Sequence, residues 1–104
     1  MNPININELP LHPTPLGGQS RMLADRPDLR LVNLLLQPGE IVKSHTAPIE
    51  VVFIIQEGSG RLTADGKAVD VTAGQMLSCP PDIAREVQAG AEGLNLLVIR
   101  VPNL

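Results

Sequence analysis

The sequence is almost free of aromatic side chains: among 104 residues it has one phenylalanine, Phe53, and neither tryptophan nor tyrosine. A site for single-stranded nucleic acid therefore lacks the rings on which bases stack, and a sugar or nucleotide held between aromatic faces is disfavoured for the same reason. Basic residues are also few, with eight Lys and Arg against eleven Asp and Glu and a net charge of −3. No basic cluster is present that would displace counterions from phosphates. We expect no nucleic-acid partner.

Cysteine and long apolar runs are scarce as well. The single cysteine, Cys79, cannot form an internal disulfide, which is typical of a reducing compartment. The longest unbroken apolar run covers residues 51–55, far short of the roughly 20 residues that a membrane-spanning helix needs. The N-terminus shows neither the basic start nor the apolar stretch of a signal peptide. We expect a cytoplasmic protein with no membrane partner.

Proline and glycine, in contrast, are frequent and set the organisation of the chain. Residues 1–18 contain Pro3, Pro10, Pro13 and Pro15, too many for a helix or a central strand. We therefore predict an extended N-terminal arm over residues 1–18 and one domain over residues 19–104. The hydrophobic fraction of 43% is enough for a single core.

From residue 20 onward, short apolar or alternating runs are separated by turn residues, a pattern typical of an all-β sandwich or barrel. Asp65-Gly66 is a strong signal for a two-residue hairpin. No stretch has a convincing helical period with a cap. The pattern predicts strands over residues 21–24, 29–37, 41–45, 50–56, 60–64, 67–71, 75–79, 83–88 and 94–101.

Two segments resemble the paired motifs of the cupin superfamily. In the first segment, Gly39 and His45 keep the spacing of the family's first glycine and first histidine. Ala47 stands where the second histidine is usual. Val51 stands where the glutamate is usual, and Glu50 comes one residue earlier.

In the second segment, Gly74 and Pro80 keep the family's spacing, whereas the polar positions have changed. Asp82 replaces a glycine, Arg85 replaces the last histidine and Ala89 replaces an asparagine. The turn residues of both motifs are thus retained and most metal ligands are not. The resemblance implies an RmlC-like jelly-roll β-barrel with a pocket between two sheets and, as in most small members, a homodimer.

The altered positions disfavour a metal or another cofactor. A typical cupin metal site uses three imidazoles and a carboxylate, of which only His45 remains at a matching position. The guanidinium of Arg85 is permanently protonated and repels a cation. A bulge that turned Glu50 inward would supply a second ligand. The alternative function is therefore a metal-dependent cupin enzyme, of the dioxygenase, isomerase or decarboxylase type, that uses His45 and Glu50.

The family's register places five candidate ligand-binding residues at the pocket: His45, Ala47, Val51, Phe53 and Arg85. Glu50 is the sixth candidate, through the bulge that would turn it inward. A cation in such a pocket must be paired or solvated, which leaves two interpretations of Arg85 open. In the structural one, it forms a salt bridge with Glu40 or Glu50 or reaches the barrel mouth. In the functional one, it binds the carboxylate or phosphate of a small acid, with His45 as a second donor.

These features predict a metal-free small cupin that binds a small acidic or aliphatic ligand, without assigning a reaction. A non-catalytic dimeric sensor or accessory barrel is a further alternative. Contiguous Leu34, Leu35 and Leu36 make both faces of their strand apolar, which also suggests a homodimer. For Cys79 we expect a buried, unreactive thiol, because no adjacent lysine or histidine would lower its pKa.

Overall fold

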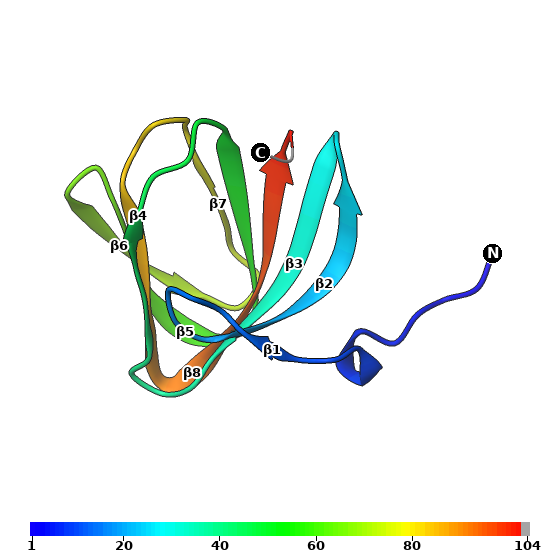
Figure 1. Ribbon diagram of the computed structural model, residues 1–104. Helices are drawn as coiled ribbons and strands as arrows, with labels where there is room; N and C mark the ends of the chain where they lie inside the picture. The colour runs from blue at the N-terminus through cyan, green and yellow to red at the C-terminus, as the bar shows by residue number, and fades with distance from the viewer. Residues whose placement is uncertain (103–104) are drawn as a thin grey trace.

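Two long antiparallel strands organise the fold, as a computed structural model that describes residues 1–102 shows. Strand β5 (Glu50–Ala64) and strand β8 (Arg85–Val101) pair from one end to the other, with register shifts near their middle. The first part of β8 also pairs with β4 (Ile41–His45), and its second part pairs with β3 (Leu29–Leu36). Both long strands therefore contribute to both halves of a barrel (Figure 1).

The remaining strands complete the barrel, and all the pairings are antiparallel. They are β1 (His12–Pro13), β2 (Gln19–Arg26), β6 (Lys67–Thr72) and β7 (Met76–Cys79). The main sheet order is β1-β2-β3-β8-β5-β6, with β4 beside β8 and β7 beside β5. The prediction of an all-β jelly-roll barrel is confirmed. Among the described residues, no helix is long and apolar enough to cross a membrane.

The prediction that residues 50–56 and 60–64 form separate strands is wrong, and so is the split of residues 83–101 into two. Each region is one continuous strand, because the glycines between the expected strands form bulges rather than turns. Gly58 has a φ of +83°, and a Cβ placed there would lie 2.1 Å from the carbonyl oxygen of Gly93. Only glycine allows β5 and β8 to approach this closely while they bend.

The core fills the inside of the barrel with apolar side chains from six strands, β3 to β8, and from the loop after β4. It consists of Leu34, Leu36, Val42, Ala47, Ile49, Val51, Phe53, Ile55, Leu62, Val71, Cys79, Val87, Ala89, Leu94 and Leu96. The alternation is clear in β5, where buried and less buried residues follow one another from Val51 to Ile55.

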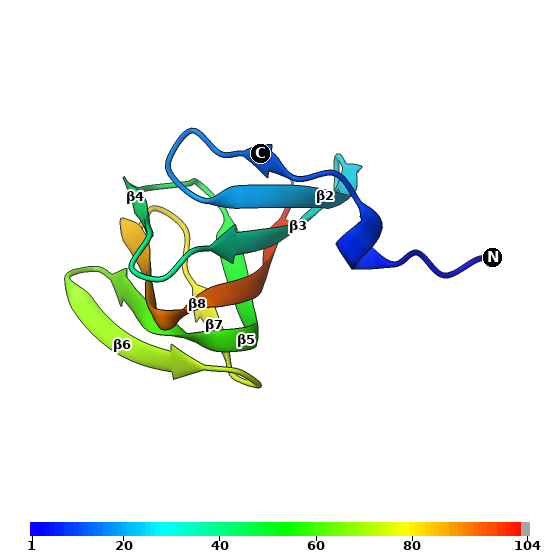
Figure 2. The ribbon, with the colours of Figure 1, turned by 90° about the horizontal axis from the view of Figure 1, so that it is seen from below.

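The N-terminal segment is extended apart from a short 3₁₀ turn, η1 (Ile6–Glu8), and it joins the sheet where β1 pairs with β2. Figure 2 shows β1 beside β2, with the residues before η1 leading away from the barrel. Arg21 of β2 holds this segment, because its Nε donates to the carbonyl of Leu9 at 3.1 Å. Its Nη1 donates to Oδ1 of Asn33, which is fully buried.

Candidate functional site

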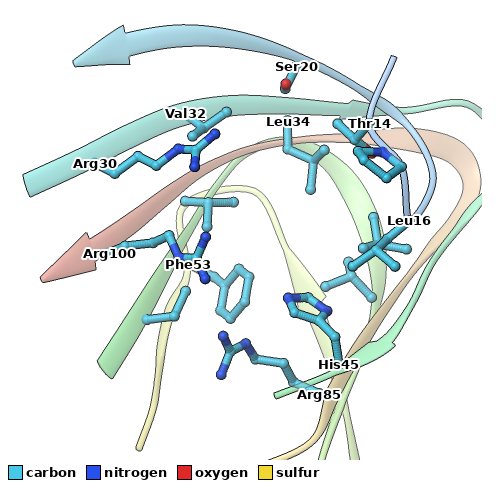
Figure 3. A pocket seen from close by; sticks show the side chains of 15 residues that line it. Thr14, Leu16, Ser20, Arg30, Val32, Leu34, His45, Phe53, Arg85 and Arg100 are labelled. Atoms are coloured by element: carbon cyan, nitrogen blue, oxygen red, sulfur yellow. The ribbon is translucent and has the colours of Figure 1, made fainter. Parts of the chain in front are cut away.

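A cavity of about 180 Å³ lies inside the barrel, with walls from β2, β3, β4, β5 and β8 and from the segment before β2. Most of the wall is aliphatic (Figure 3). The main-chain carbonyl of Leu16 accepts a hydrogen bond from Lys43 N at 2.9 Å and so fixes the N-terminal part of the wall. The polar side chains of the lining are Thr14, Ser20, Arg30, His45, Arg85 and Arg100.

The structure brings four of the six sequence-predicted site residues into this lining: His45, Val51, Phe53 and Arg85. Ala47 is buried in the core but does not line the cavity. Glu50 is exposed and lies opposite Val101 in the regular ladder between β5 and β8. The bulge that would have turned Glu50 inward is absent, since the register shifts of that ladder are between Ile55 and Gly60.

Arg85 is the most unusual residue of the cavity because it is 2% exposed and its Nε and Nη1 have no hydrogen-bond partner. Within residues 1–102 the salt bridges are Arg26–Asp28 and Arg61–Asp70, so the expected pairing of Arg85 with Glu40 or Glu50 is not formed. Glu40 instead accepts hydrogen bonds from the main chain of Gly18 and Gln37. A salt bridge of Arg85, one form of its structural interpretation, therefore has no support in the contacts.

His45 lies directly opposite Arg85 in the pairing of β4 with β8. Its Nδ1 is 3.2 Å from the carbonyl oxygen of Lys43. A carbonyl oxygen only accepts, so Nδ1 carries the proton and Nε2 is left for a ligand. The pair thus offers a guanidinium and one imidazole nitrogen to the same space.

Arg30 and Arg100 are two further cations of the lining, and the sequence analysis missed both. They are register partners across β3 and β8. Figure 3 shows the side chains of Arg30, Arg100, Arg85 and His45 pointing into the space around Phe53. Period-two alternation could have found Arg30, since Leu34 on the same strand face is buried.

Neighbouring guanidinium charges shift the pKa values of Arg85 and Arg100 in the same direction as burial does. Burial lowers the pKa of Arg85; the neighbouring Cys79 opposes this shift and the charge of Arg100 adds to it. Burial also lowers the pKa of Arg100, and the charge of Arg30 adds to that shift. A guanidinium stays protonated at neutral pH even so. Among residues 1–102, no aspartate or glutamate lines the cavity, so its field favours an anion.

The residues present do not fit the metal of a typical cupin site. Of the four positions implied by the resemblance, only His45 carries a donor, and Arg85 places a positive charge beside it. Within the described part of the chain, no group of three or more His, Cys, Asp and Glu side chains is arranged to hold a metal ion.

Cys79 is 2% exposed and free. Burial raises the pKa of its thiol, and the charge of Arg85 offsets only part of that shift. Because the thiolate is the nucleophile, we expect iodoacetamide at pH 8 to alkylate Cys79 in the folded protein at least about a hundred times more slowly than in urea. Mass spectrometry over time measures both rates. Equal rates would show that the thiol is accessible.

The family assignment follows from the sequence itself: a family model described as "Cupin domain" matches residues 33–100. The chain belongs to the cupin family. The resemblance drawn from the two motifs is thereby confirmed, and the matched residues include His45 and Arg85 of the cavity wall. A comparison with curated proteins found no match.

Solved structures agree on the fold of this cupin. A conserved protein of unknown function from Streptococcus pyogenes is 27% identical, with a TM-score of 0.75 over 82% of this chain and 74% of that one. KdgF from Halomonas sp. is 16% identical, with a TM-score of 0.86 over 94% of this chain and 90% of that one. An oxalate decarboxylase variant from Bacillus subtilis is 23% identical, with a TM-score of 0.81 over 95% of this chain but 29% of that one.

Proposed function

We propose that this cupin binds a small organic acid in the barrel cavity, through Arg85 and without a metal ion. One observation carries the proposal: the guanidinium of Arg85 is 2% exposed and lines a cavity to which residues 1–102 contribute no acidic side chain. Within that part of the chain, two of its nitrogens have no hydrogen-bond partner. An uncompensated buried charge is expensive, and a bound carboxylate supplies both the opposite charge and the missing acceptors.

The geometry of the two groups suits an oxyanion. A guanidinium donates two parallel N–H groups to a carboxylate along its Nε–Nη2 edge or its Nη1–Nη2 edge. In Arg85 each edge includes one nitrogen, Nε or Nη1, that has no hydrogen-bond partner. Nε2 of His45 accepts from a ligand hydroxyl when the ring is neutral and donates to an oxyanion when it is protonated. The aliphatic walls, among them Val51 and Phe53, accept the carbon skeleton of the acid.

The metal-dependent alternative receives no comparable support, because Glu50 points away from the cavity and Arg85 lies opposite His45. A homodimer and a cytoplasmic location remain predictions from the sequence. The first requires a mass in solution of twice the 11.1 kDa of one chain.

Thermal unfolding with a panel of small carboxylic acids and organic phosphates tests the proposal. A ligand at a hundredfold excess over its Kd stabilises the folded state by about 2.7 kcal/mol, which corresponds to a rise in Tm of roughly 10 °C or more for a domain of this size. We expect at least one acid to give such a rise, and Arg85→Met to weaken its binding at least about tenfold.

Arg61→Met is the matched control, because it also removes one guanidinium. Arg61 pairs with Asp70 on the surface and does not line the cavity. The control should bind the acid as the unchanged protein does. If no acid raises Tm, or if Arg85→Met binds with unchanged affinity, the proposed function is wrong.

A further inference from the structure

A pair of guanidiniums lies in the same cavity, apart from His45 and Arg85. Arg30 of β3 and Arg100 of β8 are register partners, so their side chains project from neighbouring positions on one face of the sheet. Both line the cavity. Figure 3 shows the two side chains entering the space from the same side.

Among residues 1–102, no carboxylate lines the cavity beside this pair. Nε of Arg30 is buried without a hydrogen-bond partner, and the charge of Arg30 adds to the lowering of the pKa of Arg100 that burial causes. Asp25 stands opposite Arg30 on β2, but it is exposed and does not line the cavity. Like charges directly opposite each other destabilise a sheet, so an anion between the two guanidiniums would relieve their repulsion.

The pair Arg85–His45 and the pair Arg30–Arg100 lie at opposite ends of β8. His45 faces Arg85 where β8 begins, and Arg30 faces Arg100 where it ends. In the view of Figure 3, the ring of Phe53 lies between Arg100 and His45. Each pair therefore suits a separate anionic group, and the wall between them is apolar.

The size of the cavity limits the length of the carbon chain that joins the two anionic groups of a ligand. Its volume of about 180 Å³ is close to the roughly 150 Å³ of an apolar cavity that holds benzene. We propose that the ligand is a short aliphatic dicarboxylate, with one carboxylate on Arg85 and His45 and the other between Arg30 and Arg100. This inference rests on the proposed acid-binding function and adds a second anion subsite to it.

Calorimetric titration with succinate and with butyrate, at one fixed ionic strength, tests the second subsite. The two acids have the same number of carbons and differ in one carboxylate. We expect the unchanged protein to bind succinate at least about ten times more tightly than butyrate. Arg100→Met should reduce that ratio to about threefold or less and leave the affinity for butyrate within about threefold of the original.

Arg30→Met should lower the ratio of succinate to butyrate affinity in the same way. It replaces Arg100→Met in the test if Arg100→Met does not unfold cooperatively and is therefore not folded. Arg61→Met, which removes a surface guanidinium, should keep the full ratio. Equal binding of the two acids by the unchanged protein, or a ratio that survives both cavity variants, would overturn the second subsite and leave the proposed function standing. Loss of butyrate binding in both variants would overturn it too, because all the arginines would then form one subsite. Failure of both acids to bind would overturn the dicarboxylate proposal alone, because the proposed function fails only if no acid of the thermal-unfolding panel raises Tm.

Discussion

Arg85→Met is expected to make the ligand-free protein more stable, by about 1–3 kcal/mol in the free energy of unfolding. The substitution removes a charge that is 2% exposed and lacks partners for two of its nitrogens. It also removes the repulsion between Arg85 and Arg100. Methionine fills the space of the aliphatic stem with a flexible apolar chain, so little packing is lost.

Far-UV circular dichroism during urea unfolding measures this change, since one Phe without Trp or Tyr gives little intrinsic fluorescence. Arg61→Met is again the control, because exposed ion pairs such as Arg61–Asp70 contribute about 0–1 kcal/mol. A loss of more than about 1 kcal/mol in Arg85→Met would mean that the guanidinium supports the fold. Stabilisation together with lost acid binding would instead show that the charge is kept for the ligand at the expense of stability.

Asn33→Leu is expected to have the opposite effect, a loss of about 3–5 kcal/mol. Asn33 is 0% exposed, and its Nδ2 donates to Asn95 Oδ1 at 2.7 Å and to the carbonyl of Leu96 at 3.2 Å. Its Oδ1 accepts from Nη1 of Arg21 at 3.0 Å. Leucine makes none of these bonds and leaves the cation of Arg21, which is 8% exposed, with fewer acceptors.

The same substitution should loosen the N-terminal segment, because Arg21 also binds the carbonyls of Leu9 and Asn7. Urea unfolding measures the loss of stability, and the rate of limited proteolysis within the N-terminal segment measures how firmly that segment is held. In the double variant Arg21→Met/Asn33→Leu, which removes both partners, the combined loss should be smaller than the sum by at least about 1 kcal/mol. Strictly additive losses would mean that the two side chains are not coupled.

Local signals in the sequence predicted most of the strands. The hairpin at Asp65-Gly66 is an example, since both residues have positive φ, 52° and 74°, as a tight hairpin turn requires. Strand β4 begins at Ile41 and ends at His45, as the sequence pattern predicted. The glycines near the middle of β5 and β8 were misread as turns because glycine permits both a turn and a bulge, and only the pairing partner decides which one forms.

The sequence by itself therefore determined the all-β class, because turn residues and alternation are local properties. Its resemblance to the cupin motifs supplied the family, the jelly-roll barrel and the placing of His45 and Arg85 in one pocket. Only the tertiary structure decided that Arg85 lacks a carboxylate partner, that Glu50 faces outward, and that Arg30 and Arg100 share the cavity. Arg30 and Arg100 are far apart in the chain and meet through the register of β3 against β8. That register depends on packing across the whole barrel, which no local pattern encodes.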